Sequence, residues 1–138
     1  MNPVAAQVRY YLELFRQGRR DDALHGLLEM DDAGLADLET AFRTCTDGGA
    51  RGFLIHVIWQ HRQPSIISLL GEAVMDSDPR VWREALDGLV TLSSPASVEA
   101  LRAAKKRRRG EDFQQWVNEA IEQAETHVDT STNPAHGG

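Results

Sequence analysis

The chain has 138 residues, of which 41% are hydrophobic and 7% aromatic, and its formal charge is −6. This composition suits one folded domain and excludes a disordered chain, and no apolar run approaches the roughly 20 residues of a membrane-spanning helix. Cys45 is the single cysteine, which excludes an internal disulfide and disfavours a zinc site built on thiolates. The first residues carry Arg9 and Glu13 and lack the basic start of a signal peptide, so we expect a cytoplasmic protein.

Apolar residues recur at helical spacing along the chain, with Ala and Leu dominant, which predicts an all-α fold. Acidic residues, proline and glycine mark the boundaries. Four of the five prolines stand where we expect the first position of a helix, because a proline there loses no hydrogen bond. Together these signals predict helices near residues 3–17, 21–30, 31–45, 50–61, 65–75, 79–92, 95–109 and 111–126.

The central region, residues 51–92, has the most regular pattern. Asp78 is placed to cap a helix that begins at Pro79. When the sequence is aligned with itself at an offset of 31 residues, Pro64 aligns with Pro95, and apolar positions on either side also align. A repeat of this length indicates helical hairpins that stack and share one continuous core.

Residues 51–109 resemble HEAT repeats, in which a turn of the type Asp-x-Asp-Pro-x-Val opens a helix rich in Arg, Ala and Leu. The matching residues are Asp76, Asp78, Pro79, Val81, Arg83, Ala85 and Leu89, with Trp82 in place of the usual arginine. The resemblance implies a right-handed α-solenoid of about four hairpins over residues 1–126. Residues 127–138 lack an apolar period, and we predict a disordered tail there. The whole chain is also similar in rhythm to small bacterial HEAT-repeat proteins, some of which are encoded as immunity partners of secreted toxins.

No sequence motif points to catalysis, and we expect no catalytic residue, cofactor or metal. His56 and His61 are five positions apart, whereas a metal-binding pair on a helix prefers three or four. The acidic pairs lie at predicted helix starts, where carboxylates cap the helix and complement its dipole. An enzyme subunit stays open as a third interpretation, which would need a pocket that gathers His25, His56 or aspartates.

Non-catalytic protein binding is the preferred function. In stacked hairpins the second helices line a concave face, and the residues expected to contact a partner are Ser68, Glu72, Asp76, Glu99, Arg102, Lys106 and Trp59. Outside the basic cluster at 102–109, the chain has nine basic and 21 acidic residues, which gives a formal charge of −12. An acidic body attracts a basic partner, so the specific hypothesis is an immunity-type inhibitor of a basic toxin domain.

The alternative is nucleic-acid binding through the basic cluster, which consists of Arg102 and the KKRRR run at 105–109. The run also falls in the last turns of a predicted helix, where cations complement the dipole. The acidic body repels phosphates and no groove-entering motif accompanies the cluster, so nucleic acid is the less favoured partner. We expect no membrane contact.

Overall fold

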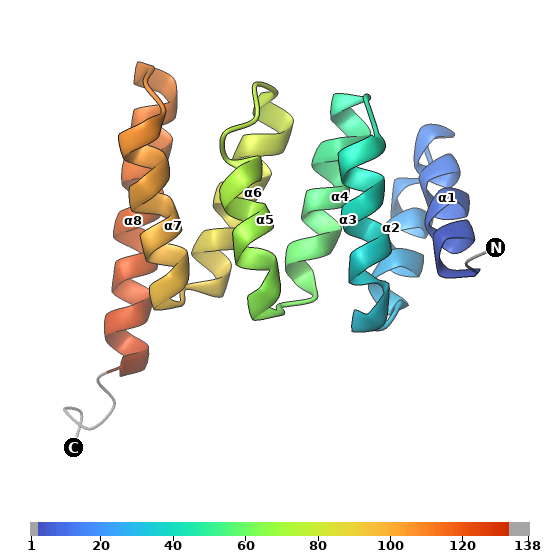
Figure 1. Ribbon diagram of the computed structural model, residues 1–138, viewed down its shortest axis with the longest axis horizontal. Helices are drawn as coiled ribbons and strands as arrows, with labels where there is room; N and C mark the ends of the chain where they lie inside the picture. The colour runs from blue at the N-terminus through green and yellow to red at the C-terminus, as the bar shows by residue number, and fades with distance from the viewer. Residues whose placement is uncertain (1–2, 133–138) are drawn as a thin grey trace.

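The computed structural model describes the backbone of residues 3–132 and the side chains of residues 3–128 (Figure 1). This part contains eight α-helices and two 3-10 turns, and no strand, which confirms the all-α class. The elements are α1 (Pro3–Arg16), α2 (Arg20–Glu29), η1 (Asp32–Gly34), α3 (Leu35–Thr44), α4 (Gly48–Gln60), η2 (Pro64–Ile66), α5 (Ile67–Ala73), α6 (Pro79–Leu92), α7 (Pro95–Arg107) and α8 (Glu111–Thr132). Within this region no helix combines the length and the apolar character needed to cross a bilayer.

Local capping signals explain most helix starts. The four prolines expected at first positions all begin helical segments, namely Pro3, Pro64, Pro79 and Pro95. Asp78 accepts a hydrogen bond from the Arg80 amide at 2.9 Å, and Ser94 accepts one from the Ser97 amide at 3.1 Å. These bonds satisfy amide groups that have no partner inside the helix. Asn2, which precedes Pro3, lies outside the described residues.

Two predicted boundaries near α3 are wrong. Asp31 accepts from the Ala33 amide at 2.8 Å and caps the 3-10 turn η1, so α3 begins at Leu35 instead of 31. Helix α4 begins at Gly48 instead of 50, and the Asp47 carboxylate caps it by accepting from the amides of Gly49 and Ala50. In both places an aspartate caps the segment that follows it.

The C-terminal ends of α7 and α8 also differ from the prediction. Helix α7 ends at Arg107 and not at 109, because Arg108 adopts an extended backbone. Helix α8 continues to Thr132, six residues beyond the predicted end at 126. Val128 packs against the core, and His127 lies 3.0 Å from the Ser93 hydroxyl, so this added turn has tertiary contacts. The rest of the predicted tail, residues 133–138, lies outside the described residues.

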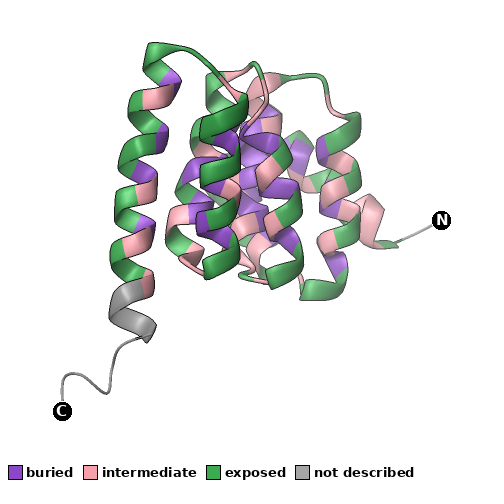
Figure 2. Ribbon diagram, turned by 60° about the vertical axis from the view of Figure 1, so that its left-hand side comes forward, coloured by how far each residue is buried: buried purple, intermediate pink, exposed green. Residues whose placement is uncertain are grey.

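The helices stand side by side in chain order and alternate between two layers (Figure 1). Helices α1, α3, α5 and α7 form the layer that we call the odd layer, and α2, α4, α6 and α8 form the even layer. Each odd helix packs on the next even helix, and neighbours within the even layer also pack on one another. The buried residues lie mainly on the sides of the helices that face other helices (Figure 2).

Side-chain hydrogen bonds join residues that are about one predicted repeat apart. The separations run from 28 to 32 positions in the pairs His56–Glu84, Arg43–Glu72, Gln63–Asp32 and Arg108–Asp76. Consecutive helical pairs therefore touch in a recurring way along the chain.

Helix α4 is the most buried element, and it approaches α6 closely. A Cβ on Gly52 would lie 2.7 Å from the Arg80 carbonyl oxygen, and a Cβ on Gly88 would lie 2.7 Å from Trp59. Both distances are shorter than atoms in van der Waals contact allow. Glycine at these two positions is thus what lets the central helices of the even layer meet.

Candidate binding surfaces

The groove between α5 and α7 is the surface of the odd layer that holds two of the predicted partner residues, Ser68 and Glu72. It encloses about 430 Å³ and is lined by Ser68, Gly71, Glu72, Met75, Ala100, Ala103, Ala104 and Arg107. Most of its lining residues are glycine, alanine or serine, and Glu72 and Arg107 are its charged groups. The Glu72 carboxylate is paired with Arg43 of α3, at 2.9 Å.

Asp76 and Trp59, two further predicted partner residues, have partners inside the molecule. The Asp76 carboxylate lies 2.6 Å from the Arg51 guanidinium, and both side chains are largely buried. The Trp59 indole is half-buried and donates to the Glu84 carboxylate at 2.9 Å. These bonds tie α4 to the turn before α6 and to α6 itself. A role for either residue in partner contact stays a prediction.

The remaining predicted residues lie on the far side of α7, facing α8. Glu99 and Arg102 line one hollow, whereas Arg102 and Lys106 line a second, larger one. Arg102 forms an ion pair with Glu125 of α8. Glu99 is exposed and has no ion pair among the described residues.

The structure divides the basic cluster by role. Arg108 turns inward, where it donates to the carbonyl oxygens of Val74 and Asp76 at 2.8 and 2.6 Å and lies over the rings of Trp82 and Phe113. Four other cations of the cluster line the larger hollow, of about 590 Å³: Arg102, Lys105, Lys106 and Arg109. Arg108 is therefore a structural residue, Arg107 lines the α5–α7 groove, and the other four form a cationic surface.

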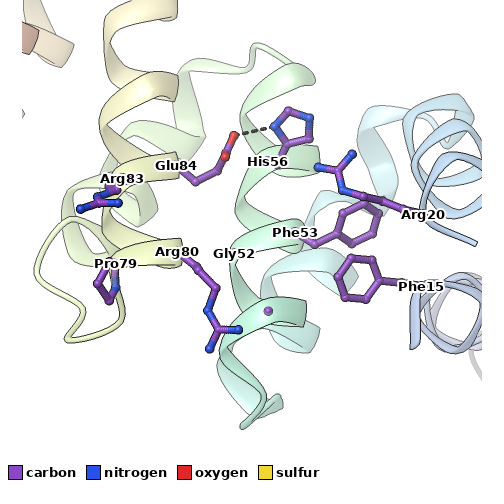
Figure 3. Close-up of a pocket in the computed structure, with 10 residues that line it drawn as sticks. Phe15, Arg20, Gly52, Phe53, His56, Pro79, Arg80, Arg83 and Glu84 are labelled. Carbon is purple, nitrogen blue, oxygen red and sulfur yellow. Dashed lines mark hydrogen bonds and ion pairs between the residues drawn. The ribbon is translucent and has the colours of Figure 1, made fainter. Parts of the chain in front are cut away.

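A cleft on the even layer was missed by the sequence reasoning (Figure 3). We call it the arginine cleft. It lies between α4 and α6, opens toward the end of α1 and the start of α2, and encloses about 450 Å³. Its lining residues are Phe15, Arg20, Gly49, Gly52, Phe53, His56, Pro79, Arg80, Arg83 and Glu84. The Arg83 guanidinium points away from Phe15 and Phe53, toward Asp112 and Trp116 (Figure 3).

An aromatic pair forms one wall of the arginine cleft. The rings of Phe15 and Phe53 stack with centroids 4.4 Å apart. The Arg20 guanidinium lies over the Phe53 ring, 5.4 Å from its centroid, a cation–π geometry (Figure 3). An apolar surface and a cation are thus presented side by side.

The opposite wall carries a hydrogen-bonded carboxylate. The Glu84 Oε1 atom lies 2.5 Å from His56 Nδ1 and accepts from the Trp59 indole. Burial alone raises the pKa of Glu84, but the hydrogen bonds from His56 and Trp59 outweigh it and the pKa is lowered. The pKa of neighbouring Asp87 is raised, first by burial and then by the charge of Glu84. Glu84 is therefore an ionised, anchored group.

The arrangement does not gather the residues that an enzyme was expected to need. His25 lies on α2 and pairs with Glu29 at 3.1 Å, whereas His56 is bound to Glu84 on α6. The described residues contain no group of three metal-binding side chains. His56 lines the arginine cleft without His25, so the histidines do not form one site.

Comparisons with protein-family models, with curated proteins and with solved structures found no match to this chain. The arginine cleft could not be predicted from a short sequence motif, because Arg20 lies some 60 positions before Arg80 and Arg83. The function is therefore argued from the surfaces themselves.

Proposed function

We propose that the chain is a cytoplasmic, non-catalytic protein-binding module, built as a right-handed HEAT-like α-solenoid of about four hairpins. Two features support this architecture. Helices alternate between two layers along the chain, and hydrogen bonds recur between residues about one repeat apart. Proteins of this kind present long surfaces that bind other macromolecules.

The α5–α7 groove is the observation that carries the binding proposal. Its floor of small residues leaves room for the side chains of a partner, and its charged walls can orient them. The Arg108 guanidinium joins the end of α7 to Val74 at the end of α5, and neither residue lines the groove. Apolar contacts supply affinity in such a groove, and the charges supply selectivity.

The specific candidate is an immunity-type inhibitor that binds a basic toxin domain. The charge of −12 outside the basic cluster supports attraction to a basic partner. Arg43 and Arg51 already pair with Glu72 and Asp76, so reversing those two charges would change internal ion pairs as well as any contact with a partner. Glu99 has no such partner, and Glu99→Lys is therefore the cleaner electrostatic variant.

The test begins with the protein that the adjacent reading frame encodes and with any protein that co-purifies at low salt. Binding of the identified partner is then measured by calorimetry for the wild type, for Ala103→Trp, which fills the α5–α7 groove, and for Ala96→Trp. Ala96 is exposed on the same helix but does not line the groove. We expect Ala103→Trp to abolish binding and Ala96→Trp to preserve it. Equal binding by all three proteins would contradict the groove assignment.

Nucleic-acid binding is the second candidate, because Arg102, Lys105, Lys106 and Arg109 line one hollow. Phosphate binding must weaken steeply with salt, since each neutralised phosphate releases a counterion. We would measure binding of a single-stranded and a duplex oligonucleotide against salt for Lys105→Ala/Lys106→Ala. The matched control is Arg9→Ala/Arg16→Ala, which removes two exposed cations from α1. Binding that is lost equally in both variants would show general charge attraction instead of a site.

A further inference from the structure

The larger hollow on the α8 side of α7, which we call the cationic hollow, gathers positive charge from the end of α7 and the turn after it. Arg102, Lys105 and Lys106 lie on α7 at positions i, i+3 and i+4, so they share one face of the helix. Arg109 follows the end of the helix and lines the same hollow. All four side chains are exposed. The spacing within one helix and the turn after it therefore bring four cations to one surface.

Carboxylates do not match the cations of this hollow. Glu125 of α8 is the acidic residue among the lining residues, and it pairs with Arg102. Lys105, Lys106 and Arg109 form no ion pair with any described residue. With four cations and one carboxylate, the lining carries a formal charge of +3. The three unpaired cations are therefore available to an anion.

The carbonyl oxygens at the end of α7 are partly occupied. The Gln114 side-chain amide donates to the carbonyl oxygens of Lys105 and Arg108, at 2.9 and 2.7 Å. Free carbonyl groups at a helix end carry partial negative charge, which disfavours an anion there. Because Gln114 also lines the cationic hollow, its amide reduces this repulsion at the place where an anion would bind.

The lining residues determine which anion fits. No aromatic ring lines the cationic hollow, so it offers no surface on which a nucleobase could stack. Side chains three or four positions apart on a helix are only about 5–6 Å from one another, so these cations need a ligand with a negative charge every few Å. Linked phosphate groups have that charge density. Ammonium and guanidinium groups bind phosphate oxygens whatever else the phosphate carries.

We infer that the cationic hollow binds a short run of linked phosphate groups at Lys105, Lys106 and Arg109, and that it contacts neither base nor sugar. Inorganic polyphosphate and the backbone of a nucleic acid both supply this chemistry. The inference deepens the second candidate function and rests on it, because both use the same hollow. It does not depend on the α5–α7 groove.

The experiment uses the full chain at low salt, with inorganic tripolyphosphate and a fluorescein-labelled thymidine hexanucleotide as probes. Calorimetry measures the affinity for tripolyphosphate, and fluorescence anisotropy follows the displacement of the labelled hexanucleotide. Citrate, which carries three carboxylates, tests for general attraction of anions. We expect tripolyphosphate to bind and to displace the hexanucleotide, and citrate at the same concentration to leave it bound.

Two neighbouring cations of α7 provide matched variants. Lys106 lines the cationic hollow, whereas Arg107 is equally exposed but lines the α5–α7 groove. We expect Lys106→Gln to weaken tripolyphosphate binding by about tenfold, because one charged hydrogen bond is removed, and Arg107→Gln to change it by less than about twofold. For Lys105→Gln/Lys106→Gln, the slope of log affinity against log salt for the hexanucleotide should change from about −2 to about −0.7, since two of three phosphate contacts are lost.

A measurement on the wild type needs no variant, because tripolyphosphate should shift the side-chain amide resonances of Gln114. The inference is overturned, and the second candidate function stands, if the hexanucleotide binds but tripolyphosphate does not displace it. If neither probe binds, both are overturned. Displacement by citrate as efficient as that by tripolyphosphate also overturns the inference, and so does an equal loss of affinity in Lys106→Gln and Arg107→Gln.

Discussion

The central helix pairs of the two layers are built in opposite ways. In the even layer, α4 and α6 meet through Gly52 and Gly88, whose missing Cβ atoms would lie within 2.7 Å of the facing helix. In the odd layer, α5 and α7 are separated by a groove, and a Cβ on Gly71 would lie 4.0 Å from that of Ala100. Glycines therefore bring α4 and α6 together closely, whereas α5 and α7 meet at ordinary van der Waals distance beside a groove. The comparison teaches that the α4–α6 contact is the tighter of the two.

The largest effect is expected for Leu89→Asp, which places a charge at a fully buried position of α6. An unpaired buried carboxylate costs several kcal/mol, comparable to the whole stability of a domain. We expect loss of the cooperative thermal transition, measured by circular dichroism. Retained helicity with an unchanged melting temperature would show that the α4–α6 contact is not central.

Glycine substitutions test the comparison directly. Gly52→Ala forces a Cβ against backbone, and we expect it to lower the free energy of unfolding by about 1–3 kcal/mol. Gly71→Ala is the matched control, where an ordinary van der Waals contact with Ala100 and better helix propensity predict a gain of up to about 1 kcal/mol. Chemical denaturation of both variants measures the two values. Equal destabilisation would mean that the layers do not differ as described.

The even layer is linked by His56–Glu84 and the odd layer by Arg43–Glu72. The contributions of these two pairs to the free energy of unfolding should depend differently on pH. The pKa of Glu84 is lowered in the folded state by His56 and Trp59, so its contribution to stability is present above its ordinary pKa of 4.5 and is lost as pH falls toward the folded value. Asp87, whose pKa is raised, contributes in the opposite sense, because the folded state binds that proton more tightly.

The measurement is therefore made in an Asp87→Asn background. There, Glu84→Gln should lower the free energy of unfolding at pH 7 by about 1.5–3 kcal/mol, the range for charged hydrogen bonds. The difference between the two proteins should shrink below pH 4.5, the ordinary pKa of the carboxyl group. A difference that is constant from pH 7 to pH 3 would exclude the ionised pair as its cause.

The smallest effect is expected at Glu72, the corresponding link of the odd layer. Its pair with Arg43 is roughly half exposed, and such pairs contribute about 0–1 kcal/mol. We expect Glu72→Gln to change the melting temperature by no more than a few degrees. A loss as large as that of Glu84→Gln would erase the distinction between the layers.

The helices and most of their starts follow from local signals, which is why the sequence sufficed for them. A proline at the first helical position and a capping side chain before it act within one turn, as at Asp78–Pro79 and Ser94–Pro95. Helical spacing likewise identified the buried positions of α6, including Leu89. The offset of 31 residues in the sequence is close to the separation of two hydrogen-bonded pairs, 31 positions for Gln63–Asp32 and 32 for Arg108–Asp76.

The tertiary structure alone decided which charged side chains are free. Asp76 and Arg108 look equally exposed in the sequence. In the structure the Asp76 carboxylate binds Arg51, and the Arg108 guanidinium binds the carbonyl oxygens of Val74 and Asp76, between α5 and α6. The arginine cleft joins Arg20 to α6 across some 60 positions, with no motif to mark it. Helix formation depends on neighbours a few residues away, but the partner of a long charged side chain depends on which helices pack together.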